Sequence, residues 1–294
     1  FKYNDNFNHS TWLTFMKNRL NVAKELLSKN GSIVVQVGNE EASYIQVLLD
    51  DIFKRENYLN HITMSTNAPS GFKATSSKIF STSNHIYLYA KDNAHNELNK
   101  LYVEKDYDTA YKYYLLNPES HFSEWKYSNI IDVIAKNEGF EDSKAYRKTI
   151  SKIEIANIIA DFAFKNKERV FRTAAVGGGA LKKRQKTVSL SKKNKGVVMQ
   201  HPNEDVANFY ILNGEMIVFW GNAFKEIDGQ LKPAQALTDV WTDIGFTGIA
   251  NEGGVTLKNG KKPELLLKRI IELTTNENDI VLDYHLGSGT TCAV

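Results

Sequence analysis

A glycine-rich turn with hydroxyl groups follows an acidic residue near the end of the chain. Asp283 is succeeded by Gly287, Ser288, Gly289 and Thr290. The apolar run 280–282 before it predicts a buried strand of a parallel sheet, and residues 290–294 predict the first turn of a helix. A strand, a glycine turn and a helix start together direct backbone N–H groups into a crevice at the edge of a sheet. This pattern favours a nucleotide-like ligand.

Two common glycine motifs do not fit this turn. A phosphate loop would continue with Gly-Lys-Ser/Thr, which is absent after Gly287. A dinucleotide fingerprint would share the first two glycines, but Cys292 takes its third glycine position. The acidic residue expected about 20 positions on would lie beyond residue 294. A nicotinamide-linked oxidoreductase therefore stays only as a competing class of enzyme.

The string from Leu282 to Thr291 resembles the S-adenosylmethionine (SAM) motif of the amino-methylating DNA methyltransferases. Tyr284 and His285 replace the Pro and Phe usual there, and this form is similar to the modification (Mod) subunits of type III restriction–modification systems. Residues 1–20 resemble the segment just after the catalytic Asp-Pro-Pro-Tyr of those subunits. That motif is expected upstream of Phe1, so the chain is interpreted as a piece of a longer protein and its catalytic residues stay unknown.

A helix start at Lys262-Pro263-Glu264 resembles the second SAM-contacting motif of the same family. It precedes Asp283 by twenty-one residues, in the order that the family uses. Proline at the first position of a helix costs no hydrogen bond, because that N–H has no partner within the helix. The resemblance implies that the following residues contact the cofactor: Lys262, Pro263, Asp283, His285, Gly287, Ser288, Gly289 and Thr290.

The elements that must position these residues follow from hydrophobic spacing. Apolar residues at spacings of three and four predict a helix from Ser10 or Thr11 to about Ser28 and a second helix after residues 39–41. Runs at 33–37, 60–66 and 85–89 predict strands. Alternating helices and strands indicate an α/β layer architecture with parallel strands. Gly177 to Gly179 are interpreted as a flexible joint, 197–200 and 209–220 as strands, and Asn213-Gly214 as a hairpin turn.

Composition narrows the class of protein. The 294 residues are 42% hydrophobic and 24% charged, with a formal net charge of +3 and one cysteine, Cys292. These values are typical of a globular protein, and the single cysteine suits a reducing cytoplasm and excludes a multi-cysteine zinc site. No run of eighteen apolar residues exists, so no membrane span is expected. No metal is expected either.

Positive charge is concentrated in two segments. Loop 67–83 contains Lys73 and Lys78, and residues 182–195 carry seven basic residues and no acid: Lys182, Lys183, Arg184, Lys186, Lys192, Lys193 and Lys195. Lysines that meet phosphates release counterions, so both segments are candidates for DNA binding. The alternative is a solvated, partly disordered loop. Tyrosines beside lysines at 102–114 could stack on bases, or could be half-buried surface residues.

The order of segments resembles the circularly permuted β group of amino methyltransferases. It implies a permuted Rossmann-like sheet formed by a catalytic-side half (1–95) and a SAM-binding half (236–294), with a target-recognition insert between them (96–235). The implied function is site-specific methylation of adenine N6 in double-stranded DNA, with SAM as cofactor. A second Mod copy and a restriction (Res) subunit are the implied partners. Cytosine-N4 methylation and a non-catalytic DNA-binding module remain alternatives.

Overall fold

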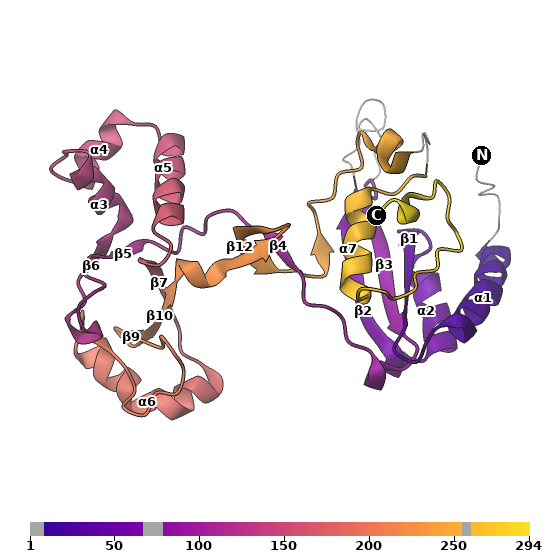
Figure 1. Ribbon diagram of the computed structural model, residues 1–294, viewed down its shortest axis with the longest axis horizontal. Coiled ribbons are helices and arrows are strands. Elements are labelled where there is room, and N and C mark those ends of the chain that lie inside the picture. The colour runs from indigo at the N-terminus through magenta and orange to yellow at the C-terminus, as the bar shows by residue number, and fades with distance from the viewer. Residues whose placement is uncertain (1–8, 67–78, 255–259) are drawn as a thin grey trace. The chain divides into compact units, whose positions relative to one another are not determined.

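The computed structural model describes residues 9–66, 79–254 and 260–294, and the chain divides into two compact units (Figure 1). Unit 1 comprises residues 1–101 and 236–294, and unit 2 comprises residues 102–235. The boundaries of these compact units fall at 101/102 and 235/236, compared with the expected 95/96 and 235/236. The two ends of the insert are adjacent, because the Leu237 N–H donates to the Leu101 carbonyl at 2.9 Å. The functions expected of the segments remain predictions.

Unit 1 is a mixed sheet with helices on both faces. Its helices are α1 (His9–Leu26), α2 (Ala42–Phe53) and α7 (Glu264–Thr274), with short 3₁₀ turns η6 (Ile249–Gly254) and η7 (Thr290–Cys292). Its strands are β1 (Ser32–Gly38), β2 (Tyr58–Ser65), β3 (Ser83–Ala90) and β13 (Val240–Trp241). The helices and strands expected before residue 90 are thus confirmed, with ends that shift by one to three residues.

The strand order is β1-β3-β2-β13, and only the β2–β13 pair is parallel. β3 pairs antiparallel with both β1 and β2, so the prediction of a parallel sheet is wrong for these strands. Strands covered on both faces are apolar along their whole length in either direction. Hydrophobic runs therefore identified the strands without fixing how they pair.

The pleat divides the sheet residues of unit 1 between two cores. Ile33 and Val35 of β1 and Tyr87 and Tyr89 of β3 pack against α1 and α2. On the opposite face, Ile86 and Leu88 of β3, with Ile62 and Met64 of β2, pack against Trp241 and against Leu266 of α7. Figure 1 shows α7 on one face of the sheet and α1 and α2 on the other. Side chains alternate between the faces of a strand, so each strand contributes to both cores. β3, which has a partner on each side, is buried from Ile86 to Ala90.

Unit 2 contains a six-stranded sheet of order β6-β5-β7-β10-β9-β8 and a three-stranded sheet of order β11-β12-β4. Its helices are α3 (Ile130–Asn137), α4 (Ser143–Thr149), α5 (Lys152–Lys165) and α6 (Gly178–Lys193). Its strands are β4 (Tyr102–Glu104), β5 (Tyr113–Leu115), β6 (Tyr127–Asn129), β7 (Val170–Ala174), β8 (Val198–Met199), β9 (Ile211–Leu212), β10 (Glu215–Phe219), β11 (Phe224–Ile227) and β12 (Gln230–Ala236).

The predicted hairpin between β9 and β10 is confirmed. Asn213 and Gly214 have φ angles of 55° and 85°, as a tight turn between twisted strands requires. Two of the tyrosines of 102–114, Tyr111 and Tyr114, are neither base platforms nor surface residues, because both are buried in the core under α3 and α5, where the Tyr111 ring lies against Trp220. These two rings are occupied by packing and have no free face for a base.

Candidate functional site

Residues 280–282 do not form the strand that their apolar character predicted. Ile280, Val281 and Leu282 are 96%, 48% and 59% exposed, and their backbone is irregular. A strand is stabilised by hydrogen bonds to a neighbouring strand, and no strand of the described residues pairs with this run. The strand was predicted from apolar side chains alone, and apolar character does not ensure that a neighbouring strand is present.

The glycine turn that follows is well defined. Gly287 and Gly289 have φ angles of 56° and 74°, which side chains with a Cβ rarely adopt. The Gly289 N–H donates to the Leu286 carbonyl, and the Cys292 N–H donates to the Gly289 carbonyl, both at 2.9 Å. The helix expected at 290–294 is present as the single 3₁₀ turn η7. Its first residue, Thr290, is 3% exposed.

Asp283 holds both ends of this turn. One carboxylate oxygen accepts the His285 backbone N–H at 3.0 Å, and the other accepts the Thr291 hydroxyl at 2.6 Å. Inside the loop, the hydroxyls of Ser288 and Thr290 lie 2.7 Å apart. An ionised carboxylate is a strong acceptor, so these bonds fix the path of the loop between residues 283 and 291.

The start of α7 and the turn η6 pack against η7. A Cβ on Gly253 would lie only 3.3 Å from the Cα of Thr290, so a residue with a side chain at 253 would crowd η7. The Glu264 carboxylate accepts the Gly253 N–H, and the Glu264 N–H donates to the Glu252 carboxylate at 2.7 Å. These reciprocal bonds hold η6 against the first turn of α7. Expected site residues from both motifs thus lie on elements in mutual contact.

Lys262 and Pro263 precede α7 in this assembly. Pro263 is buried and immediately precedes the helix, one position earlier than expected. Lys262 is half-buried, and burial lowers the pKa of its ammonium group. The neighbouring Lys261, which is 6% exposed, donates to the backbone carbonyls of Ala250 and Glu252 in η6. The sequence did not identify Lys261 as a candidate, because only its burial in the folded chain distinguishes it from the other lysines.

His285 points toward α1. Its ring centroid lies 6.1 Å from that of Phe15, which carries the Arg19 guanidinium 3.4 Å above its face. Partial burial, followed by repulsion from Arg19, lowers the pKa of His285, so the ring is predominantly neutral at pH 7. An uncharged aromatic side chain therefore stands at the position where the resembled motif has phenylalanine.

A second polar group lies at the start of β3. His61 and His85 share a hydrogen bond of 2.8 Å, and the other His85 nitrogen lies 3.1 Å from the Asn39 amide oxygen. The His61 ring stacks on Tyr87 at 4.4 Å. Burial lowers the pKa of both histidines. Their adjacent positions on β2 and β3 could not be read from the sequence, because the pairing register was unknown.

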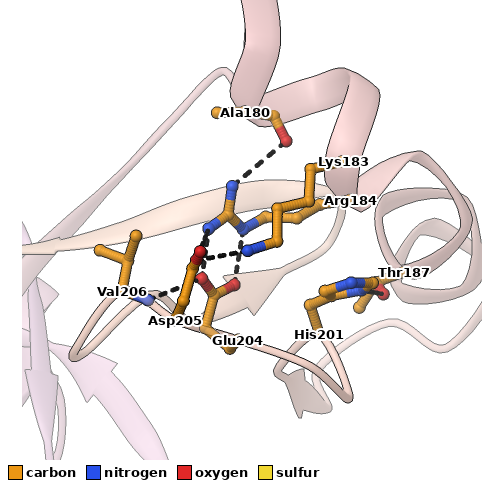
Figure 2. A network of polar contacts seen from close by, with 8 residues as sticks. All are labelled: Ala180, Lys183, Arg184, Thr187, His201, Glu204, Asp205 and Val206. Atoms are coloured by element: carbon orange, nitrogen blue, oxygen red, sulfur yellow. Dashed lines mark hydrogen bonds and ion pairs between the residues drawn. The ribbon is translucent and has the colours of Figure 1, made fainter.

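The basic run of unit 2 forms α6, so both the joint at Gly177 to Gly179 and the partly disordered loop are wrong. Gly177 is the N-cap and Gly178 and Gly179 form the start of the helix, whereas residues 180–186 (Ala-Leu-Lys-Lys-Arg-Gln-Lys) are strong helix formers. Arg184, expected to contact DNA, is 3% exposed and donates through two nitrogens to the Glu204 carboxylate (Figure 2). Its charge is neutralised inside the protein, so it cannot serve as a phosphate contact.

The other basic residues of the run are all exposed and differ in their contacts. Lys183 pairs with Asp205, and the stem of Lys192 lies over the Gly214 backbone. Lys182, Lys186 and Lys193 lie on the side of the helix opposite its buried residues. Lys73 and Lys78 lie outside the described residues.

In the part of the chain that the structure describes, no helix has the length and apolar character that crossing a membrane requires. Within the same residues, no three His, Cys, Asp or Glu side chains gather as a metal site.

The chain belongs to the DNA methylase family, whose sequence profile matches residues 1–294. Among its relatives is the probable type III restriction-modification enzyme HindVI Mod subunit of Haemophilus influenzae. It is 36% identical over 317 aligned residues, which cover 100% of this chain and 42% of the relative. The EcoPI Mod subunit of Escherichia phage P1 is 24% identical over 96% of this chain and 42% of its own length.

A more local similarity extends to type II enzymes. The methyltransferase M.BamHI of Bacillus amyloliquefaciens is 49% identical over 61 residues, which cover 20% of this chain and 13% of that enzyme. The chain thus spans about two fifths of the length of the two type III relatives, at 42% of each. The family resemblance stated from the motifs is confirmed.

Proposed function

We propose that the protein carrying this chain is a DNA adenine-N6 methyltransferase that uses SAM, and that it acts as the modification subunit of a type III restriction–modification system. The observation that carries the proposal is the contact between the Asp283-anchored glycine turn and the start of α7. Those two segments are the ones that resemble the SAM motifs. Membership of the DNA methylase family along the whole chain supports the same assignment.

The glycine turn fits a cofactor of this size. A Cβ built on Gly289 would meet no atom within 4 Å, so the main chain there faces open space that a ligand can approach. Asp283 keeps the turn in shape, and Gly287 and Gly289 give it positive φ angles that residues with a side chain rarely adopt. Lys262 and Pro263 border the site from α7, and Ser288, Thr290 and His285 complete it. When bound, SAM supplies an electrophilic methyl group on a sulfonium.

The remaining part of the proposal concerns fold and substrate. Segment 1–95 is assigned to the catalytic side and 236–294 to the SAM side of a circularly permuted Rossmann-like sheet, with 96–235 as the target-recognition insert. The target amino group is stacked within a duplex, so the base must be flipped out for reaction. The protein then orients the amino nitrogen toward the methyl group and excludes water. Loop lysines Lys73 and Lys78 are proposed to contact phosphates.

Partners follow from the relatives. Both type III relatives are Mod subunits of restriction-modification enzymes. A restriction (Res) subunit and a second Mod copy are therefore proposed to assemble with this protein, and double-stranded DNA is its proposed substrate. Cytosine-N4 methylation is the second candidate, because the matched family covers both amino groups. Analysis of methylated bases in DNA digests distinguishes the two.

The first test is a calorimetric titration of the 294-residue chain with SAM, with NAD as the control ligand. The proposal expects binding of SAM in the micromolar range and none of NAD. Binding of NAD without SAM would refute the methyltransferase assignment and restore the oxidoreductase. Absence of both would show that the SAM site of this chain is not functional by itself, and methylation must then be assayed in the longest protein that contains it.

A further inference from the structure

Helix α6 presents two faces of different chemistry. One is buried against unit 2 and consists of Arg184, Thr187, Val188 and Ser191. At 100° per residue, the opposite face is centred near Lys193 and contains Lys182, Gln185, Lys186, Ser189 and the apolar Leu190, all of them exposed. The six residues extend over three helical turns, or about 16 Å of helix length. This set is called the outer face of α6.

Contacts on the buried side fix the orientation of the helix. Arg184 lies 3.8 Å above the Phe209 ring and is paired with Glu204, whose carboxylate also accepts the Val206 N–H at 3.0 Å (Figure 2). At the other end of α6, the Ser191 hydroxyl accepts the Gly214 N–H of the hairpin turn at 3.1 Å. The helix is therefore held near its middle at Arg184 and near its C-terminal end at Ser191, and its outer face is presented in one orientation.

Charge distinguishes this face from an ordinary solvated helix surface. α5 exposes both signs, with Lys152 and Lys165 beside Glu154 and Asp161. The whole stretch 169–203, by contrast, contains no Asp or Glu. The acids that approach α6, Glu204 and Asp205, bind Arg184 and Lys183 and leave the outer face to its three lysines. An acid-free cationic face complements the phosphates of a duplex.

The outer face also carries groups that can read bases. Gln185 lies between Lys182 and Lys186 in the sequence of the helix, and Ser189 lies one turn after Gln185. A glutamine amide can both accept from N6 and donate to N7 of adenine in the major groove, and serine hydroxyls can donate or accept. The major groove admits one α-helix. Lysines on the same face would meet the phosphates that border the groove.

We propose that α6 enters the major groove of the target duplex, where Gln185 reads an adenine, Ser189 contacts a neighbouring base, and Lys182, Lys186 and Lys193 bind phosphates. The assignment rests on the proposed DNA methyltransferase function and adds the residues that determine its recognition sequence. It also explains why a buried ion pair holds the helix, since base readout requires a rigid support.

The test is selection of bound duplexes from a randomised library by the 294-residue chain. The wild-type chain is compared with Gln185→Ala and Ser189→Ala. The matched control is Gln230→Ala, at an exposed glutamine that begins β12. Gln185→Ala should reduce the preference for adenine at one position by about fivefold to a hundredfold. Gln185→Arg should change the preferred base at that position to guanine.

A second arm measures how affinity for a fixed duplex depends on salt. Combined replacement of Lys182, Lys186 and Lys193 by alanine should reduce the slope of log K against log salt by about 2.7, at about 0.9 for each phosphate contact. Lys148→Ala on α4 is the control and should leave the slope unchanged. Gln185→Ala should leave it unchanged as well, because a base contact releases no counterions.

An unchanged sequence preference in both Gln185→Ala and Ser189→Ala would overturn the assignment of α6. So would a wild-type chain that binds no duplex or binds all sequences equally. None of these results bears on SAM binding, which the calorimetric titration measures separately. Failure of SAM binding together with a base preference that depends on Gln185 would instead count against the proposed enzyme and leave α6 as a DNA reader.

Discussion

Replacing Arg184 by alanine tests whether its buried ion pair holds α6 in place. The side chains of Arg184 and Glu204 are each 4% exposed. The guanidinium donates to both carboxylate oxygens, lies over the Phe209 ring and is 3.4 Å from the Ala180 carbonyl. Alanine removes all of these contacts and leaves Glu204 buried without its cation.

The expected loss of unfolding free energy is about 3 kcal/mol. Removing one partner of a buried pair costs roughly 3–5 kcal/mol, since the remaining charge stays desolvated. The lower end applies here because Asp205, beside the pair, is 73% exposed and water can reach the edge of the network. A loss of that size is about a hundredfold in the folding equilibrium constant. Lys183→Ala, which breaks only the exposed pair with Asp205, should have a far smaller effect.

Hydrogen exchange of peptides from 178–206, followed in increasing urea, measures the stability of this unit without interference from the other one. Equal losses in Arg184→Ala and Lys183→Ala, or a loss below about 1 kcal/mol in the former, would refute the reasoning.

Acid provides an independent check on the same pair. The hydrogen bond from Arg184 holds the pKa of Glu204 below its usual value of 4.5. The stabilisation is therefore complete above pH 4.5 and is lost as the pH falls through the lower pKa of the folded state. Glu204→Gln should reduce this part of the acid sensitivity, whereas an unaltered acid profile would show that the pair does not contribute.

Three further predictions concern unit 1. Gly287→Val should abolish SAM binding in calorimetry. Gly229→Val, at a glycine of unit 2 with a similar φ of 72°, is the control and should leave SAM binding unchanged. If Gly287→Val binds SAM within about threefold of the wild-type affinity, the cofactor binds elsewhere. Arg269→Ala breaks a bidentate pair with Asp243 at 2.6 and 2.9 Å. It should lower the free energy of unfolding by about 1–2 kcal/mol, because the Asp243 side chain is half-exposed and stays hydrated. An unchanged midpoint of urea unfolding would contradict this. Burial lowers the pKa values of His61 and His85, so the stability that is fully present above pH 6.5 should be lost as the pH falls below 6.5 through the lower pKa values of the folded state. The urea midpoint of His61→Asn/His85→Asn should fall less below pH 6.5, and an equal fall would contradict this.

Local elements could be predicted from the sequence wherever hydrophobic spacing was regular. The stripe of α1 and the Asn213-Gly214 hairpin depend on neighbours within a few residues, and both are confirmed. Pairing direction and the exposed run 280–282 depend on partners elsewhere in the chain. Apolar residues are compatible with several such partners, so these features could not be read from composition and spacing.

The candidate sites show the same limit. Asp283 and the glycine turn were identified because their order is characteristic of a family, and the turn brings its own partners within ten residues. Arg184 was counted among free cations because its partner Glu204 lies twenty residues later, beyond any helical spacing. Only the folded chain shows which charges of a basic run neutralise an acid and which remain available.

The hydrogen bond between Leu237 and Leu101 has an evolutionary consequence. It brings the ends of residues 102–235 together at 2.9 Å, so unit 1 closes its own backbone whatever lies between them. The cost of closing a loop grows only slowly with its length, by about 0.6 kcal/mol for each doubling. Under the proposed function, recombination at the borders of residues 102–235 would change the target sequence in one event and leave the fold of unit 1 intact.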